Sequence, residues 1–137
     1  MLGIMGAASV VLVILILVNR PAAERATEFT ARDNLRTALS LAETIRSQEG
    51  SFSQATALAL RRADPDLLFI DPDEASNNSE VISVYAADLL WAAAVRAETG
   101  ACYWLRIRPG GSPVFGSGSD CTGLAARSGA PSAWPSP

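Results

Sequence analysis

The feature that most constrains this chain is an uncharged apolar run at residues 2–18, LGIMGAASVVLVILILV. A helix rises about 1.5 Å per residue, so a helical run of this length spans about 26 Å. That length just crosses a bilayer, or is buried in a packed bundle of helices. Neither the basic stretch before the run nor the small-residue cleavage site after it that marks a cleavable signal peptide is present, so we expect the run to stay in the working protein.

The run is predicted to form a membrane-spanning segment or the core of a packed helix bundle. A plain anchor on a single-pass membrane protein is the simpler alternative. The large apolar residues that make up this segment are Leu2, Ile4, Val10, Val11, Leu12, Val13, Ile14, Leu15, Ile16, Leu17 and Val18.

An amphipathic helix is predicted to follow. Pro21 has no N–H for the carbonyl of Leu17, so we expect a kink there. Apolar residues then recur at three- and four-residue steps and predict one buried stripe. Gly50 is expected to end the helix. The stripe contains Phe29, Leu35, Ala38, Leu39, Ala42 and Ile45, and charged residues, Arg32 and Arg36 among them, fill the other face.

Composition excludes several functions. The formal net charge of −3 leaves no basic surface for nucleic acid. The chain has no His, which removes the commonest general base and metal ligand, and it has no Gly-rich phosphate loop after a strand. We therefore expect no enzyme activity and no cofactor.

A small head is predicted after the helix, and such a head has a thin core. Cys102 and Cys121 are consistent with one disulfide and an oxidising compartment. Joining them closes a loop that the chain-entropy model rates at roughly 3 kcal/mol.

The head is predicted to begin with a short helix over 51–62, with Ser53 as its N-cap, and an extended segment at 67–70 between Asp-Pro turns. Strand-like runs follow at 81–86, 90–97 and 102–108, with a short edge strand at 114–115. Gly100 indicates a tight hairpin between the second and third runs.

Alternation in the run at 102–108 predicts that Tyr103, Leu105 and Ile107 face the helix. Residues 116–137 are expected to lack regular structure except where Cys121 holds them. The chain is thus divided into a stalk helix at 1–50, with an apolar part at 1–20 and an amphipathic part at 21–50, a head at 51–126 and a Ser/Pro-rich tail at 127–137.

In combination, these pieces resemble the bacterial type IV pilins and their pseudopilin relatives. The resemblance covers the apolar run up to Pro21, the continuation ARDNLRTALSLAETIRSQEG at 31–50, the segment 51–70, GACYW at 100–104 and Cys121-Thr-Gly. It implies an α+β type IV pilin fold: a long N-terminal helix whose apolar half protrudes, with a three- to four-stranded antiparallel sheet on its second half.

The resemblance also implies a function. The chain would be a structural subunit that polymerises through its apolar helix into an extracellular pilus-like filament for adhesion, motility or DNA uptake. Its partners would be copies of itself, the inner membrane before assembly, and the assembly machinery with its leader peptidase; no nucleic acid would lie in the core. The subunit would start as a precursor in the cytoplasmic membrane and end in a cell-surface filament.

Two alternatives stay open: a pseudopilin of a type II secretion or competence piston, and a single-pass membrane-anchored exported domain. Family members usually carry Glu as the fifth mature residue, whereas this chain has Met5. This difference favours the pseudopilin alternative. The comparison takes Met1 as the processed N-terminus, which is usually methylated in the family.

Membrane orientation depends on the same processing. Arg20 and Arg25 follow the apolar run, which alone would place the head in the cytoplasm, although a disulfide favours the opposite side. A basic leader before Met1, removed after insertion, would reconcile the two.

Some residues have weaker alternatives. Asp64, Asp66, Asp71, Asp73 and Glu74 lack the Gly and closing Glu of a calcium loop, so we expect solvated turns. Asn77 and Ser132 are candidate glycosylation sites. Trp134 lies in a Pro/Ser-rich tail and is expected to dock against a neighbouring subunit.

Overall fold

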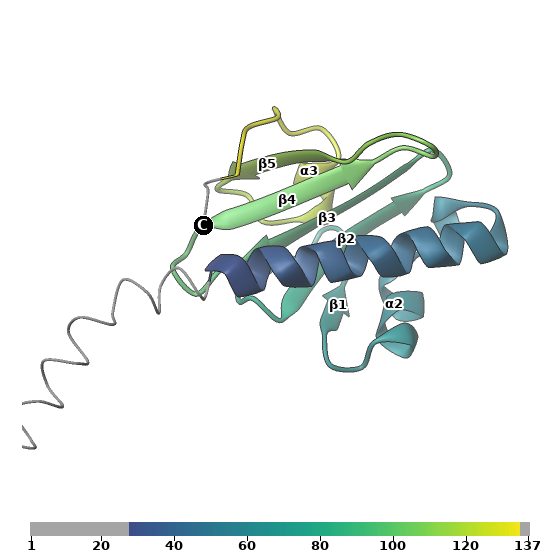
Figure 1. Ribbon diagram of the computed structural model, residues 1–137. Helices are drawn as coiled ribbons and strands as arrows, with labels where there is room; N and C mark the ends of the chain where they lie inside the picture. Colours follow the sequence, from purple (N-terminus) through teal and green to yellow (C-terminus); the bar gives the residue numbers. More distant parts are fainter. Residues whose placement is uncertain (1–27, 135–137) are drawn as a thin grey trace, which may run out of the picture.

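A computed structural model describes residues 28–134 of the chain. It places a helix over residues 28–49 in front of a twisted five-stranded sheet (Figure 1). The 3-10 turn η1 (Phe52–Gln54) and the helix α2 (Ala57–Ala63) lead into the sheet, and a short helix, α3 (Gly123–Ala126), follows it. The strands are β1 (Leu68–Ile70), β2 (Val81–Ala87), β3 (Leu90–Arg96), β4 (Cys102–Ile107) and β5 (Val114–Gly118).

The strands lie in chain order, β1-β2-β3-β4-β5. β1 pairs with β2 in parallel, whereas the other three pairs are antiparallel. The turn between β3 and β4 contains Gly100 at φ 93°, as the hairpin prediction requires. Gly50, at φ 85°, follows the last helical residue, which confirms that it ends the helix.

The predicted type IV pilin fold is wrong. The sheet has five strands instead of three or four, and it is mixed instead of antiparallel. Within residues 28–134 there is no long apolar helix, because the helix over 28–49 is amphipathic. The apolar half of the expected helix lies outside the described residues.

The physical reason for the mixed sheet is the segment at Leu68–Ile70, which lies within the extended segment predicted between two Asp-Pro turns. It forms a parallel ladder with β2, and Phe69 and Ile70 are buried. Hydrogen bonds between the buried residue Ser76 and Arg96 of β3 fix the crossover between the two strands, residues 71–80. The Ser76 hydroxyl accepts a hydrogen bond from Arg96 N–H at 2.9 Å, and the Arg96 guanidinium donates to the carbonyls of Ser76, Gly100 and Ser119.

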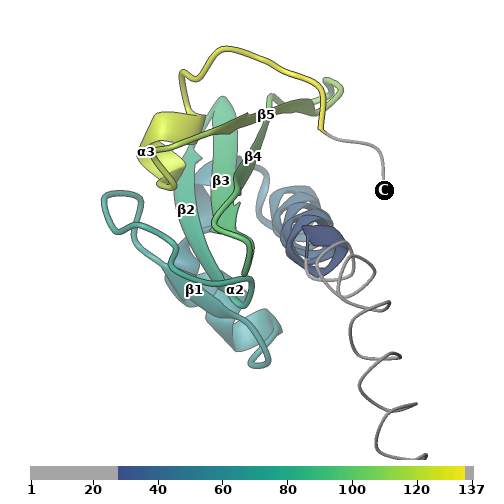
Figure 2. The ribbon, with the colours of Figure 1, turned by 90° about the vertical axis from the view of Figure 1, so that its left-hand side faces the viewer.

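One face of the sheet packs against the long helix (Figure 2). Tyr103, Leu105 and Ile107 of β4 lie in the same buried cluster as the helix residues, which confirms the predicted alternation. The helix contributes Ala31, Leu35, Ala38 and Ala42, all fully buried, and Leu39 and Ile45, partly buried. Phe29, predicted to be in the stripe, is instead 49% exposed.

The opposite face carries a second, smaller cluster. It contains Ala92, Ala94, Trp104 and Ala126 and surrounds the Cys102–Cys121 disulfide, which confirms the predicted bridge. α3 lies on this face against β2 and β3. Regular structure within 116–137 is therefore more extensive than expected, since β5 runs to Gly118 and α3 follows the bridge.

Two helix caps determine where the short helices begin. Thr56, not the predicted Ser53, caps α2 by accepting a hydrogen bond from Ala59 N–H at 3.3 Å. Thr122 caps α3 by accepting one from Ala125 N–H at 3.0 Å. Ser53 instead donates its backbone N–H to the Ser51 hydroxyl, so the predicted single helix is two short pieces.

Gly116 provides a test of the β4–β5 packing. A Cβ added to Gly116 would lie 2.0 Å from a ring carbon of Trp104, the residue opposite it in β4. Overpacking of this kind costs about 1–3 kcal/mol, so we expect Gly116→Ala to lower the free energy of unfolding by that amount. Urea denaturation of the full chain in mild detergent measures the change.

Gly118 is the matched control. It lies in the same strand, yet a Cβ added to it would meet nothing within 4 Å. Gly118→Ala should therefore change the stability by less than about 0.5 kcal/mol. Equal effects of the two substitutions would contradict this packing.

Candidate functional site: a groove between the long helix and the C-terminal segment

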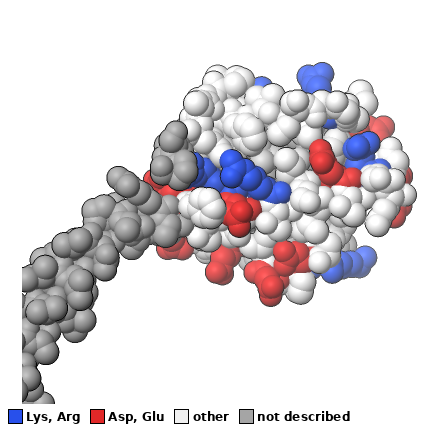
Figure 3. Space-filling model, in the orientation of Figure 1, with Lys and Arg blue, Asp and Glu red and all other residues white. Residues whose placement is uncertain are grey.

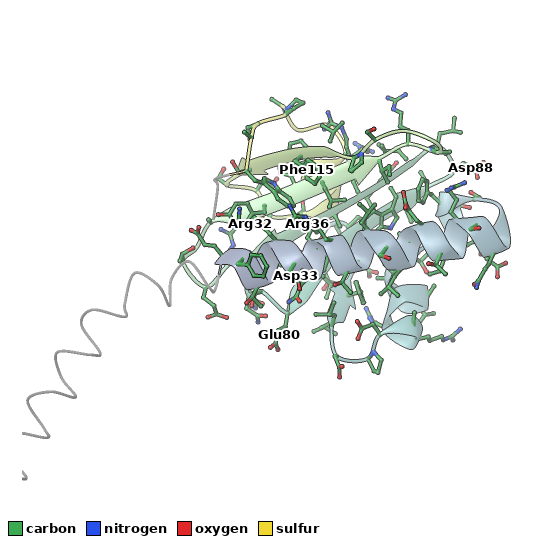
Figure 4. All side chains as sticks on the ribbon, viewed as in Figure 1. Arg32, Asp33, Arg36, Glu80, Asp88 and Phe115 are labelled. Carbon is green, nitrogen blue, oxygen red and sulfur yellow. A yellow bond between two sulfur atoms is a disulfide. The ribbon has the colours of Figure 1, made fainter. Side chains whose placement is uncertain are left out.

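A shallow groove of about 440 Å³ separates the long helix from the C-terminal segment of the described chain. The helix contributes Arg36 and β5 contributes Phe115, whose positions are labelled in Figure 4. The C-terminal segment contributes Pro131, Ser132, Ala133 and Trp134. Arg36 is the single charged residue among these lining residues.

The C-terminal segment is fixed by hydrogen bonds to the outer edge of β5. Ser132 N–H donates to Phe115 O at 3.1 Å, and the Ser132 hydroxyl accepts from Ser117 N–H at 3.0 Å. The Trp134 indole N–H donates to Gly116 O at 2.8 Å. The two Ser132 bonds satisfy β5 groups that would otherwise form an open sheet edge, so the segment protects that edge.

An aromatic cluster forms the floor of the groove. The Trp134 ring lies edge-to-face with Phe115, at a centroid distance of 4.6 Å, and with Tyr103, at 5.8 Å. The Arg36 guanidinium lies 5.3 Å from the Trp134 centroid, within cation–π range. The groove thus combines an exposed cation with apolar surface.

Trp134 was predicted to dock on a neighbouring subunit, and this stays a prediction, but the structure also gives the ring a packing site within its own chain. The indole is half-buried on the chain's own β5 and helix. Sequence reasoning missed this partner because Phe115 and Arg36 are far from Trp134 along the chain. The available signal in the sequence was the pair of hydrogen-bonding groups in the tail, the Ser132 hydroxyl and the Trp134 indole N–H.

Two charged residues, Glu28 and Arg32, lie in the first turns of the described helix. Arg32, predicted on the exposed face, is 5% exposed, and its guanidinium lies 5.5 Å from the Tyr103 ring centroid. The Thr99 hydroxyl donates to the Glu28 carboxylate at 3.2 Å. Burial raises the pKa of Tyr103, and the charge and hydrogen-bond acceptor of Glu28 raise it further, against a smaller lowering by Arg32.

Charge is unevenly distributed on this side of the molecule. In Figure 3, Arg side chains gather above the N-terminal part of the described helix, and Asp and Glu side chains lie below it. Figure 4 assigns Arg32 and Arg36 to the upper group and Asp33 and Glu80 to the lower one. The groove is therefore on the basic side of the helix.

The remaining predicted site residues have these outcomes. Asn77 is exposed, and Ser132 is exposed although its hydroxyl is engaged by β5. Across residues 28–134, no three His, Cys, Asp or Glu side chains lie together as a metal site would require, and this covers the carboxylates at 64–74. Met1, Pro21 and the segment at 2–18 lie outside the described residues.

A search of the described helices finds none that is both long and apolar enough to span a bilayer.

Comparisons with protein-family models, with curated proteins and with solved structures find no match to this chain.

The Tyr103 environment predicts a specific pH dependence. Its folded pKa lies above the ordinary 10.0, so the folded state keeps a proton that the unfolded chain loses. The free energy of unfolding should therefore be undiminished below pH 10 and fall as the pH rises from there through the folded pKa. Glu28→Gln should lower the pKa of Tyr103 and reduce the fall.

Ultraviolet absorbance of tyrosinate measures this pKa, with Tyr103→Phe assigning the signal against Tyr85, the other tyrosine. Stability curves between pH 8 and 11 supply the second readout. An unchanged Tyr103 titration in Glu28→Gln would show that the carboxylate does not act on the phenol.

Proposed function

We propose that this chain is a structural subunit of an extracellular helical filament, assembled from copies of itself through the apolar segment at residues 2–18. The role is mechanical, not enzymatic. Before assembly the subunit is held in the cytoplasmic membrane; afterwards the apolar segments are buried against one another and the heads form the outer surface. Leader peptidase and assembly machinery act on it as on type IV pilins.

The observation that carries the proposal is the placement of the long helix. Its inner face is occupied by the chain's own sheet, through residues such as Leu35, Ala38 and Ala42. Residues 19–27 separate the uncharged run from the described start of this helix at residue 28. The run is therefore a second apolar stretch, separate in the sequence from the stripe that packs on the sheet.

Energetics favour contact between copies. Burying one Leu, Ile or Val side chain contributes about 1.5–3 kcal/mol. The segment contains eleven such residues, so its exposure to water is far more costly than the small stability of the head. Packing identical segments together removes that cost without a second kind of chain.

The proposal does not depend on the type IV pilin fold, which the mixed sheet excludes. A short pseudopilin piston, built through the same apolar segment, is the second candidate. Fibre length separates the two candidates: a filament subunit forms long fibres, whereas a piston subunit forms short ones.

Negative-stain electron microscopy after detergent removal from the full chain is the test. We expect long fibres from the unmodified chain and none from Leu12→Glu, because a carboxylate in the apolar contact costs several kcal/mol. Leu58→Glu is the matched control, since Leu58 is 55% exposed on α2 and its variant should still polymerise. Fibres from Leu12→Glu, or none from the unmodified chain, would contradict the proposal.

A further inference from the structure

We propose that the groove of one subunit receives the β2–β3 turn of a second copy of this chain. The inference rests on the proposed function, because it names a contact between heads in the assembly. Its two surfaces are the groove defined above and the tip, defined here as Asp88 and Leu89 between the paired residues Ala87 and Leu90.

The tip presents an exposed apolar side chain next to an exposed carboxylate, a combination suited to docking on another protein surface. Leu89 is 74% exposed, more than the other exposed large hydrophobic residues of the described chain. Asp88 is exposed beside it and accepts a hydrogen bond from the Ser51 hydroxyl. That bond ties the turn to the start of η1, so the tip is presented in one orientation.

The groove offers the complementary chemistry. Phe115 and Trp134 provide an apolar surface for Leu89, and Arg36 provides the opposite charge for Asp88. Within residues 28–134, Arg36 is engaged by the Trp134 ring and forms no ion pair with a carboxylate. A docked tip would therefore place an acid against an available cation and an exposed Leu against half-buried aromatic rings.

The two surfaces lie at different ends of the head. Figure 4 shows Asp88 near the C-terminal end of the long helix, whereas Arg36 and Phe115 lie toward its N-terminal end. A subunit cannot fill its own groove with its own tip. The contact is therefore heterologous, and each added copy leaves one free tip and one free groove, which produces an open chain of subunits.

One neighbouring cation restricts the approach. Arg108 is exposed and directly follows β4, whose last residue, Ile107, pairs with Trp91 near the tip. The tip must therefore enter with Asp88, not Arg108, facing Arg36.

Cysteine cross-linking of the full chain in membranes tests the contact. Both native cysteines are joined in the disulfide, so introduced thiols pair with each other. Leu89→Cys with Ala133→Cys, both at exposed positions, should give covalent dimers, trimers and longer species on oxidation. Leu58→Cys with Ala133→Cys is the matched control and should stay monomeric.

Charge reversal supplies a second readout. In the Leu89→Cys, Ala133→Cys chain, Arg36→Asp should lower the cross-linking rate about fivefold, the effect of losing roughly 1 kcal/mol of exposed ion pair. Adding Asp88→Arg should restore the rate. Failure of the second change to restore it would overturn the pairing of these two residues.

The outcomes separate this proposal from the filament proposal. Fibres without cross-linked species, or equal cross-linking in the Leu58 control, overturn the tip contact and leave the filament intact. Cross-linked species from a chain that forms no fibres support the contact and overturn the filament. Absence of both overturns both.

Discussion

The structure depends on the close contact between the small-residue face of the long helix and the centre of the sheet. Ala31, Ala38 and Ala42 are fully buried, so the helix backbone lies near the strands without large side chains between them. Leu35 and the β4 residues fill the remaining space. The head gains its core from this contact, because a sheet of this size exposes one face to water without it.

The other face of the sheet is covered by α3, which a disulfide and hydrogen bonds hold in place. The disulfide ties β4 to the segment before α3, and Gly123 brings α3 so close to β2 that an added Cβ would lie 2.7 Å from Tyr85 N. The Arg106 guanidinium donates to the carbonyl of Gly129 at 2.7 Å and holds the chain beyond α3. The C-terminal segment then reaches the β5 edge, which is how the groove is formed between distant parts of the chain.

Local patterns predicted the parts of this fold that depend on local chemistry. The alternation of side chains along β4 correctly predicted which face packs on the helix. The need for a positive φ correctly predicted Gly50 at the end of the helix and Gly100 in the β3–β4 turn. The parallel pairing of β1 could not be predicted, because three residues carry little periodicity and their partner follows a loop. The groove was missed for a similar reason: its members come from the helix, β5 and the tail, and only the fold brings them together.

The most direct test of this account is amide hydrogen exchange of the full chain in detergent, measured by nuclear magnetic resonance at increasing urea. If the helix and sheet form one core, the amides of Ala38 and Leu105 should exchange with the same free energy of opening and the same dependence on urea. Exchange at Ala38 that is orders of magnitude faster, while Leu105 stays protected, would show that the helix opens independently and would contradict the account.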